Sequence, residues 1–261
     1  MNTPPVVLCF GGFDPTNGAG LQADTLTIHA LGCHPLSVVT ANTIQDSIKV
    51  HEFLVTDPAV VRRQAAALLA DTAIAACKTG MLASPAVVET VAELVGLLPS
   101  AVPLVVDPVL AAGGGASLAE NGLVRALREW LLPRATVVTP NIPELLALAG
   151  LPDDMDQAAR SLLAGGRASV LVTGTHDIAT SDVVHRLYRP DGTVTASRWA
   201  RLAPDFHGSG CTLGAALAAY LARGDTLAVA VDAALDYTWN SLRHAYAVGR
   251  GQAFPDRRDG R

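Results

Sequence analysis

Short runs of β-branched residues alternate with longer segments rich in Ala and Leu along most of the chain. A helix is expected over residues 20–31, ended by Gly32, and another near residue 58, where Asp57 can cap a helix that begins with a proline. Alternation of this kind predicts an α/β fold: one domain with a doubly wound, mostly parallel sheet and flanking helices. The predicted strands are residues 6–11, 36–41, 50–55 (an extra strand), 74–78, 104–107, 135–139 and 170–173.

The pattern changes after residue 180. Residues 183–188 and 194–199 flank a Pro-Asp-Gly turn signal, which predicts a small antiparallel hairpin. Two helices are expected to follow, over residues 209–222 and 226–248. Residues 250–261 are polar and rich in Arg and Asp, so we expect a domain over residues 1–249 and a loose C-terminal tail over 250–261.

The composition argues against nucleic-acid and membrane partners. The chain has a net charge of -5 and a calculated pI of about 5.7, without a basic patch for nucleic acid or anionic lipid. Its most apolar stretch, residues 213–235, contains Arg223 and Asp225, and so falls short of the roughly 20 uninterrupted apolar residues of a membrane span. Residues 1–5 lack the basic start of a signal peptide, so we expect a cytoplasmic protein.

A glycine-rich segment follows the first predicted strand. Residues 11–20 read GGFDPTNGAG and lead into a helix that carries Asp24. Glycines allow a ligand to approach the backbone closely, and the start of a helix favours an anion or a polar group. The segment lacks the Gly-Lys-Ser/Thr of a P-loop and is not a clean dinucleotide-binding fingerprint. Taken alone, it could also be a tight connection without a ligand.

The four cysteines show neither C-x-x-C pairing nor metal-ligand spacing. Cys9 and Cys77 lie in apolar runs, as buried thiols do, and Cys33 is uninformative. Cys211 differs, because it lies in the segment FHGSGCT (206–212) at the start of an apolar helix. The backbone N–H groups and the dipole of such a helix could hold the charge of a phosphoryl group, and would favour a Cys211 thiolate. A thiolate or a polarised thiol can accept a proton from a substrate hydroxyl. The alternative is a glycine-rich helix cap with a small buried cysteine.

Further polar residues follow other predicted strands. Lys78 begins the segment KTGML, Asp107 begins DPV, and residues 139–144 read TPNIPE. In open α/β sheets ligands bind beyond the carboxyl ends of the strands, so these side chains should gather around one site. Asp107 and Glu144 suit a Mg²⁺ ion held largely through water, and Asn141 can donate to a phosphate. Any one of them alone would be a cap or a solvated polar group.

Between residues 12 and 212 the chain contains, in order, Gly-x-Asp-Pro-(x)₃-Ala-Gly-(x)₃-Asp, Lys-x-Gly-Met-Leu, Asp-Pro-Val, Thr-Pro-Asn-x-x-Glu and His-Gly-x-Gly-Cys-Thr. The combination resembles the hydroxymethylpyrimidine/phosphomethylpyrimidine kinases of thiamine biosynthesis, in the ribokinase-like superfamily. Most ribokinase-like kinases have Asp where Cys211 stands, whereas these pyrimidine kinases and a few pyridoxal kinases have Cys.

The resemblance implies a kinase that uses ATP and Mg²⁺, is usually a homodimer, and phosphorylates 4-amino-5-hydroxymethyl-2-methylpyrimidine and then its monophosphate. Cys211 would be the base, the amides of Gly208, Ser209 and Gly210 would form the anion hole, and Asp107 and Glu144 would hold the metal. The other implied contacts are with the pyrimidine for Gly12, Asp24, Gln45, Met81 and Val109, and with the nucleotide for Lys78, Asn141, Thr173 and His207.

The chain departs from the family pattern in four places. Phe13 stands where Ser or Thr is usual, and the glycines of residues 113–115 replace a Lys-Ser-Gly-like loop. Residues 173–175 (TGT) replace Lys-Gly-Gly, and residues 249–252 (GRGQ) replace a Gly-His-Gly-rich ending. Losing two lysines near the phosphates would weaken nucleotide binding or shift that work to Lys78 and the metal. The alternatives are a pyridoxine/pyridoxal kinase, which Gln45 and Met81 disfavour, and a non-catalytic protein that binds vitamin precursors.

Overall fold

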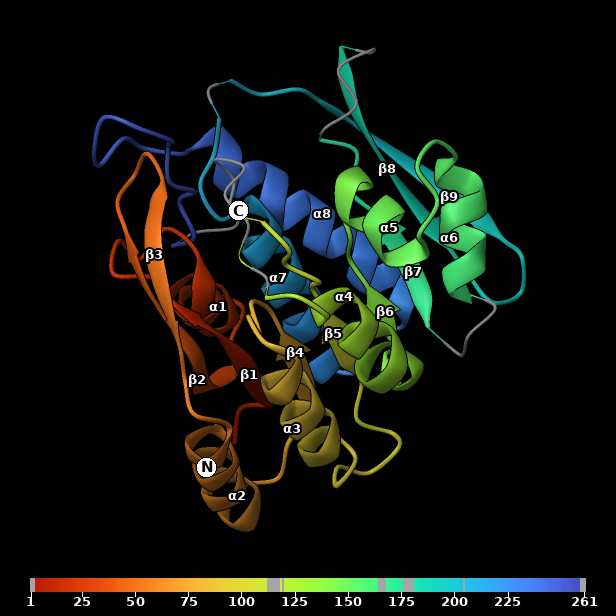
Figure 1. Ribbon diagram of the computed structural model, residues 1–261. Helices are drawn as coiled ribbons and strands as arrows, with labels where there is room; N and C mark the ends of the chain where they lie inside the picture. The colour runs from red at the N-terminus through yellow and green to blue at the C-terminus, as the bar shows by residue number, and fades with distance from the viewer. Residues whose placement is uncertain are drawn as a thin grey trace.

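The computed structural model describes residues 3–111, 118, 120–163, 168–175, 181–203 and 205–258. The strands among these residues form one sheet in the order β3-β2-β1-β4-β5-β6-β7-β8-β9 (Figure 1). All pairs from β2 to β7 are parallel. These parallel strands are β1 (Val6–Phe13), β2 (His34–Gln45), β4 (Ala76–Thr79), β5 (Leu104–Val106), β6 (Val137–Val138) and β7 (Ser169–Val172).

The two edges of the sheet are antiparallel. β3 (Val50–Val55) pairs antiparallel with β2 on one edge. On the other edge β8 (Asp182–Tyr188) pairs antiparallel with both β7 and β9 (Val194–Ala200), and β8 and β9 form the predicted hairpin. The predicted doubly wound, mostly parallel sheet with one small hairpin is therefore confirmed.

Helices cover both faces of the sheet. α1 (Gly20–Ala30), α7 (Ser209–Ala222) and α8 (Leu227–Arg243) pack on one face. The other face carries α2 (Pro58–Asp71), α3 (Pro85–Val95), the short α4 (Leu123–Ala126), α5 (Ile142–Ala149) and α6 (Met155–Leu163). A π-helical turn (Leu127–Leu131) and a 3₁₀ turn (Leu132–Arg134) follow α4.

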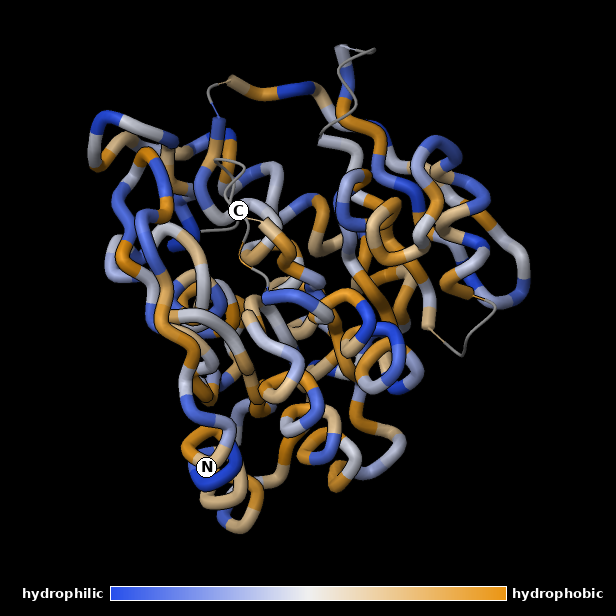
Figure 2. The backbone as a smooth tube through the Cα atoms, viewed as in Figure 1, coloured by the Kyte–Doolittle hydropathy of each residue, from blue (hydrophilic) through white to orange (hydrophobic). Residues whose placement is uncertain are grey.

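Successive side chains of β1 pack alternately against the helices on the two faces of the sheet. Val7 and Cys9 pack among α1, α7 and α8, whereas Leu8 and Phe10 pack against α2 and α3. Because neighbouring side chains of a strand point to opposite faces, a strand buried on both sides has a continuous apolar sequence. Figure 2 shows the result: the tube is largely orange and white through the centre and blue mainly in outer turns.

The end of the chain differs from the sequence-based expectation. α8 ends at Arg243 rather than near residue 248, because Tyr246 turns back to exchange backbone hydrogen bonds with Phe254. The loose tail is also wrong for residues 250–258. Phe254 and Arg257 are 3% and 4% exposed, and the backbone of Ala253 pairs with Asp205 and His207. The polar composition was misleading because the donors of Arg257 find partners inside the fold.

Candidate active site

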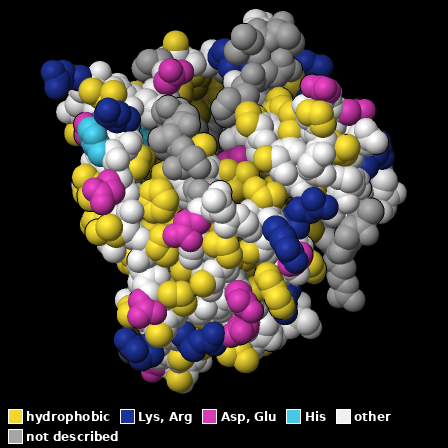
Figure 3. Space-filling view, viewed as in Figure 1, with side chains coloured by type: hydrophobic (Ala, Val, Ile, Leu, Met, Phe, Trp, Pro, Cys, Tyr) yellow, Lys and Arg dark blue, Asp and Glu magenta, His cyan; other side chains and the backbone are white. Residues whose placement is uncertain are grey.

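One cavity of about 720 Å³ lies beyond the carboxyl ends of the parallel strands. It is open on the upper side of the molecule in Figure 3, where hydrophobic side chains are visible on its wall. The residues that follow β1, β4, β5, β6 and β7 all contribute to its lining, as expected for an open α/β sheet. All the site residues named from the sequence line this cavity, from Gly12 near its first strand to Cys211 on α7.

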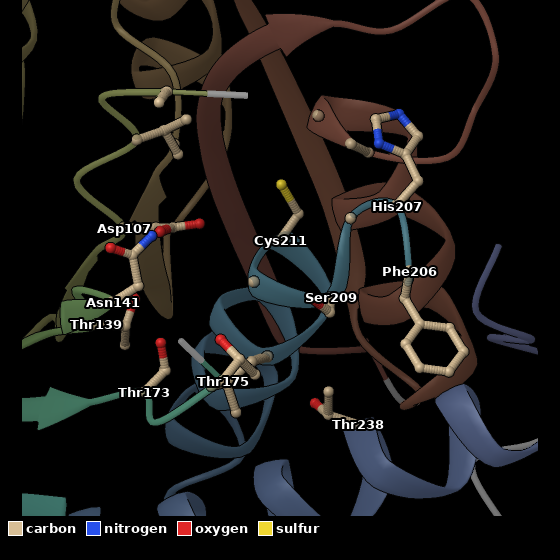
Figure 4. A pocket seen from close by; sticks show the side chains of 18 of the residues that line it. Asp107, Thr139, Asn141, Thr173, Thr175, Phe206, His207, Ser209, Cys211 and Thr238 are labelled. Atoms are coloured by element: carbon tan, nitrogen blue, oxygen red, sulfur yellow. The ribbon is translucent and has the colours of Figure 1, made fainter. Parts of the chain in front are cut away.

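The start of α7 forms one wall of the cavity. Gly208 precedes the helix with a φ of 79°, in the left-handed region that favours glycine, and no side chain caps the helix. The next three residues, Ser209, Gly210 and Cys211, therefore present N–H groups that have no partner within the helix. Figure 4 shows the Cys211 side chain pointing from this helix start into the cavity. The arrangement suits an anion at the helix N-terminus.

The expected Cys211 thiolate is not supported. Burial raises the pKa of Cys211 to about 12; Lys78 opposes this shift, whereas Asp107 and Asp24 add to it. Desolvation and nearby carboxylates thus outweigh the helix dipole, on which the sequence-based argument depended. The raised pKa favours the protonated thiol at neutral pH, so any role of Cys211 in moving protons must start from that form.

Lys78 and Asp24 meet at the floor of the cavity. The Lys78 Nζ lies 2.9 Å and 3.0 Å from the two carboxylate oxygens of Asp24, and both side chains are almost completely buried. Burial by itself would lower the pKa of Lys78, but Asp24, together with Cys211 and Asp107, raises it. The ammonium of Lys78 is thus held by Asp24, although the sequence had assigned the two residues to different ligands.

His207 connects two loops. Its Nε2 lies 2.9 Å from Oδ2 of Asp14, and its ring is 5.5 Å from that of Phe254. Burial would raise the pKa of Asp14, but hydrogen bonds from His207, Thr16 and Ala19 hold it below its usual value. Figure 4 shows His207 on the other side of Cys211 from Asp107. The geometry fits a link between loops better than the nucleotide contact predicted for His207.

An acidic wall lies across the cavity from α7. Asn141 and Glu144 form a capping box at the start of α5: Glu144 N–H donates to Asn141 Oδ1, and Asn141 N–H donates to Glu144 Oε2. Burial and the nearby Asp107 carboxylate raise the pKa of Glu144 to about 8. Burial also raises the pKa of Asp107 to about 6, against the effect of Lys78. Two buried carboxylates thus share this wall.

The acidic wall fits a hard divalent cation. The Asp107 carboxylate accepts no hydrogen bond from any residue that the structure describes, and the buried Thr139 hydroxyl has no partner there either. Figure 4 places Thr139 beside Asp107 and Asn141. In the described part of the chain no three His, Cys, Asp or Glu residues form a closed metal cluster. Such a site suits Mg²⁺, which usually binds one or two carboxylates and keeps several waters.

The model of the phosphomethylpyrimidine kinase family matches residues 14–256. The chain belongs to the phosphomethylpyrimidine kinase family. A hydroxymethylpyrimidine/phosphomethylpyrimidine kinase of Streptomyces coelicolor is 40% identical over 258 residues, which cover 95% of this chain and 93% of that protein. A protein of the same name from Haemophilus influenzae is 36% identical, with 96% of each chain covered. The kinase class predicted from the motifs is confirmed.

Solved structures of related kinases share the fold. The pyridoxal kinase from Staphylococcus aureus in complex with pyridoxal superposes with a TM-score of 0.89 at 27% identity, covering 98% of this chain and 94% of that one. A phosphomethylpyrimidine kinase from Clostridium difficile gives 0.77 at 30% identity, covering 90% and 97%. The predicted ribokinase-like architecture is therefore confirmed for this member of the phosphomethylpyrimidine kinase family.

In this family member the part of the cavity near β2 has a polar side, formed by Gln45, and an apolar side, formed by Met81 and Val109. Gln45 Nε2 donates to Thr43 Oγ1 at 2.6 Å, which leaves the Gln45 carbonyl oxygen for another partner. A side chain at Gly12 would crowd the sulfur of Met81, and Val109 packs against the cluster that contains Met81. These positions agree with the pyrimidine-binding roles implied by the family resemblance, which remain predictions.

Sequence reasoning missed part of the lining. Trp199 on β9 and Trp239 on α8 lie with ring centroids 5.7 Å apart at the same cavity, and Arg257 supports α7 from behind. No motif marks these residues, since each lies within an ordinary strand, helix or tail pattern. Gly113–Gly115, where the sequence suggested a missing lysine, and His176 lie outside the described residues. The presence of glycine at position 174 has a local explanation, because a Cβ there would overlap the carbonyl oxygen of Val184.

Proposed function

We propose that this kinase transfers the γ-phosphoryl group of ATP to the hydroxymethyl group of 4-amino-5-hydroxymethyl-2-methylpyrimidine, and then a second phosphoryl group to the monophosphate. The observation that carries the proposal is the free start of α7, with Cys211 directed into a cavity whose opposite wall bears Asp107 and Asn141. Donors on one wall and carboxylates on the other suit an in-line transfer between an alcohol and a metal-bound nucleotide. The names of the relatives from Streptomyces and Haemophilus support the same acceptors.

Cys211 would relay a proton in the first transfer. A protonated thiol cannot accept a proton without losing its own, and burial keeps Cys211 protonated. We infer that the hydroxymethyl proton passes to the Cys211 sulfur while the thiol proton passes to an oxygen of the transferred phosphoryl group. The loose transition state of phosphoryl transfer allows this exchange late, when the attacking oxygen has become acidic. The N–H groups of Ser209 and Gly210 would stabilise the charge on the phosphoryl oxygens.

The second transfer needs charge neutralisation more than a base, because the acceptor is already a phosphate. Asp107 and Glu144 would hold Mg²⁺ through one or two direct bonds and through water, as their burial on one wall allows. A bound Mg²⁺ ion would supply compensation for the phosphate charges. Asn141 and Thr173, on the same side of the cavity, would contact the nucleotide.

A pyridoxal kinase activity is the second candidate. It is favoured by the overlap with the Staphylococcus aureus pyridoxal kinase over 98% of the chain. ADP release from Mg·ATP, measured side by side with hydroxymethylpyrimidine, its monophosphate and pyridoxal, separates the two. Turnover of both pyrimidines with little pyridoxal activity supports the proposal, and dominant pyridoxal turnover refutes it. If none of the three acceptors stimulates ADP release while substrate and nucleotide still bind, a binding role replaces the catalytic one.

We further propose a cytoplasmic homodimer that binds neither nucleic acid nor membranes. In the part of the chain that the structure describes, none of the helices combines the length and apolar character needed to cross a bilayer. The net charge of -5 is consistent with small-molecule partners. Light scattering of the purified protein would measure the oligomeric state, and a single mass equal to one chain would refute the dimer.

A further inference from the structure

Arg257 is a buried cation behind the start of α7. Its side chain is part of the C-terminal segment (residues 249–258), and the residue is 4% exposed. The guanidinium donates from Nε to Thr212 Oγ1 at 2.9 Å and from Nη2 to the Gly18 carbonyl at 2.6 Å. A longer bond of 3.5 Å joins Nη1 to the carbonyl of Asn17. One side chain thus bonds both the loop after β1 and the first turn of α7.

This guanidinium is buried without a carboxylate partner within the described ranges of the chain. Burying a charge without a counter-ion is costly unless hydrogen bonds satisfy it, so carbonyl and hydroxyl acceptors must compensate here. An alkyl side chain would fill the space without this cost, which indicates a role beyond packing.

The two elements that Arg257 joins are in direct backbone contact. A Cβ on Gly208 would overlap the carbonyl oxygen of Gly18, and a Cβ on Gly18 would overlap the His207 ring. On one side of this contact His207 binds Asp14, and on the other side Arg257 binds Gly18 and Thr212. The relative position of the loop and the helix is therefore held from both sides.

We propose that Arg257 is a positioning residue for phosphoryl transfer, which keeps the cavity-lining loop of residues 14–20 aligned with the N–H groups at the start of α7. The proposal rests on the function proposed above, in which the helix start receives the phosphoryl group, and Asp14, Ala19 and Gly20 of the loop line the same cavity. Displacement of aligned reacting groups by about 1 Å can cost roughly 10²-fold in rate, even when it originates away from the chemistry. Loss of Arg257 should therefore affect the transfer itself more than the binding of ATP.

The test compares Arg257→Gly and Arg257→Lys with Arg258→Gly, a matched control whose side chain is 82% exposed and pairs with Asp256. We expect Arg257→Gly to lower kcat by about 10²-fold with a much smaller change in the KM for ATP. Added guanidinium ion, well below denaturing concentrations, should restore part of kcat in this variant, and NaCl of equal ionic strength should not. Arg258→Gly should stay within about twofold of the wild type.

Arg257→Lys keeps the charge but replaces three separate donor nitrogens by one, so it cannot reach all three acceptors. Its kcat should therefore lie between those of Arg257→Gly and Arg258→Gly. This variant carries the test if Arg257→Gly does not fold, as judged by circular dichroism. A folded Arg257→Gly or Arg257→Lys with the kcat of Arg258→Gly overturns the proposal, as does a loss of kcat in Arg257→Gly that guanidinium ion leaves unchanged.

Hydrogen–deuterium exchange separates this proposal from the proposed function. In Arg257→Gly the amides of residues 14–20 and 208–212 should exchange faster than in the wild type, with no such change in Arg258→Gly. Unchanged exchange in both segments overturns the positioning role even in an active enzyme. If the wild type phosphorylates none of the acceptors, the proposed function is refuted. The exchange result then still shows whether Arg257 holds the loop of residues 14–20 against the start of α7.

Discussion

The Nζ of Lys78 lies 2.9 Å from a carboxylate oxygen of Asp24 beneath the cavity, with 1% and 2% of the two side chains exposed. Replacing Lys78 by Met leaves the Asp24 charge buried without its partner, which should reduce the free energy of unfolding by about 3–5 kcal/mol. Urea denaturation measures the change. The double variant Lys78→Met/Asp24→Leu should recover much of it, because two apolar side chains can replace a buried ion pair at little cost.

The exposed pair Arg125–Glu129 provides the control for this prediction. Arg125→Ala should change the free energy of unfolding little, because water solvates both of its charges. Equal losses of stability in Lys78→Met and Arg125→Ala would contradict the conclusion that burial makes the Lys78–Asp24 pair different.

The Cys211 thiol should make stability fall at alkaline pH. Its pKa of about 12 in the folded protein exceeds the value of about 8.5 for a free thiol. Between these values the folded state binds more protons than the unfolded one, so this contribution is complete below about pH 8.5 and declines as pH rises toward 12. Unfolding free energies of wild type and Cys211→Ala, measured in EDTA from pH 8 to 10.5, should converge or cross as the wild type loses stability faster. Parallel curves would show that the thiol is not perturbed.

Asn141 should matter for both stability and kinetics. Asn141→Ala removes the side-chain cap of α5, which should cost about 1 kcal/mol of unfolding free energy. It also removes a polar group from the acidic wall and should raise the KM for ATP by about tenfold. Ser84→Ala is the matched control, since Ser84 caps α3 outside the cavity. It should lose similar stability with unchanged kinetics, and equal kinetic effects in the two variants would refute the assignment of Asn141.

Gly208 and Gly192 both have positive φ, at 79° and 85°, but only Gly208 has a neighbour where a Cβ would lie. Gly192→Ala should cost about 1 kcal/mol, the strain of a left-handed alanine. Gly208→Ala adds an overlap with the Gly18 carbonyl, so its loss should be larger by at least about 1 kcal/mol. Thermal denaturation compares the two variants. A Gly208→Ala variant as stable as Gly192→Ala would mean that the loop moves aside at no cost.

The sequence predicted helices, strands and turns well where local patterns decide structure. The apolar runs of β1 and β7, the turn between β8 and β9 and the proline after Asp57 each act within a few residues. Convergence of the motifs on one cavity followed from a general property of parallel sheets, so it needed no knowledge of side-chain contacts.

The sequence did not reveal contacts between distant parts of the chain. Asp24 and Lys78 were assigned to two ligands because nothing in either motif records that they bind each other. The same holds for His207 and Asp14, and for Arg257, whose tail looked disordered by composition. The expected Cys211 thiolate is disfavoured for a different reason: the helix dipole can be inferred from sequence, whereas the desolvation that outweighs it depends on the packed surroundings.

The central place of β1 has a consequence for folding. The first strand of the chain pairs with β4, which follows α1, β2, β3 and α2 in the sequence, and packs against α7 from near the other end of the chain. The floor of the cavity therefore cannot form from local contacts, and chains dominated by such distant pairings fold slowly. Until α7 docks, the apolar face of β1 stays exposed and is a place where unfinished chains can associate. Substrates recognise only the completed sheet, so they should slow unfolding rather than speed folding.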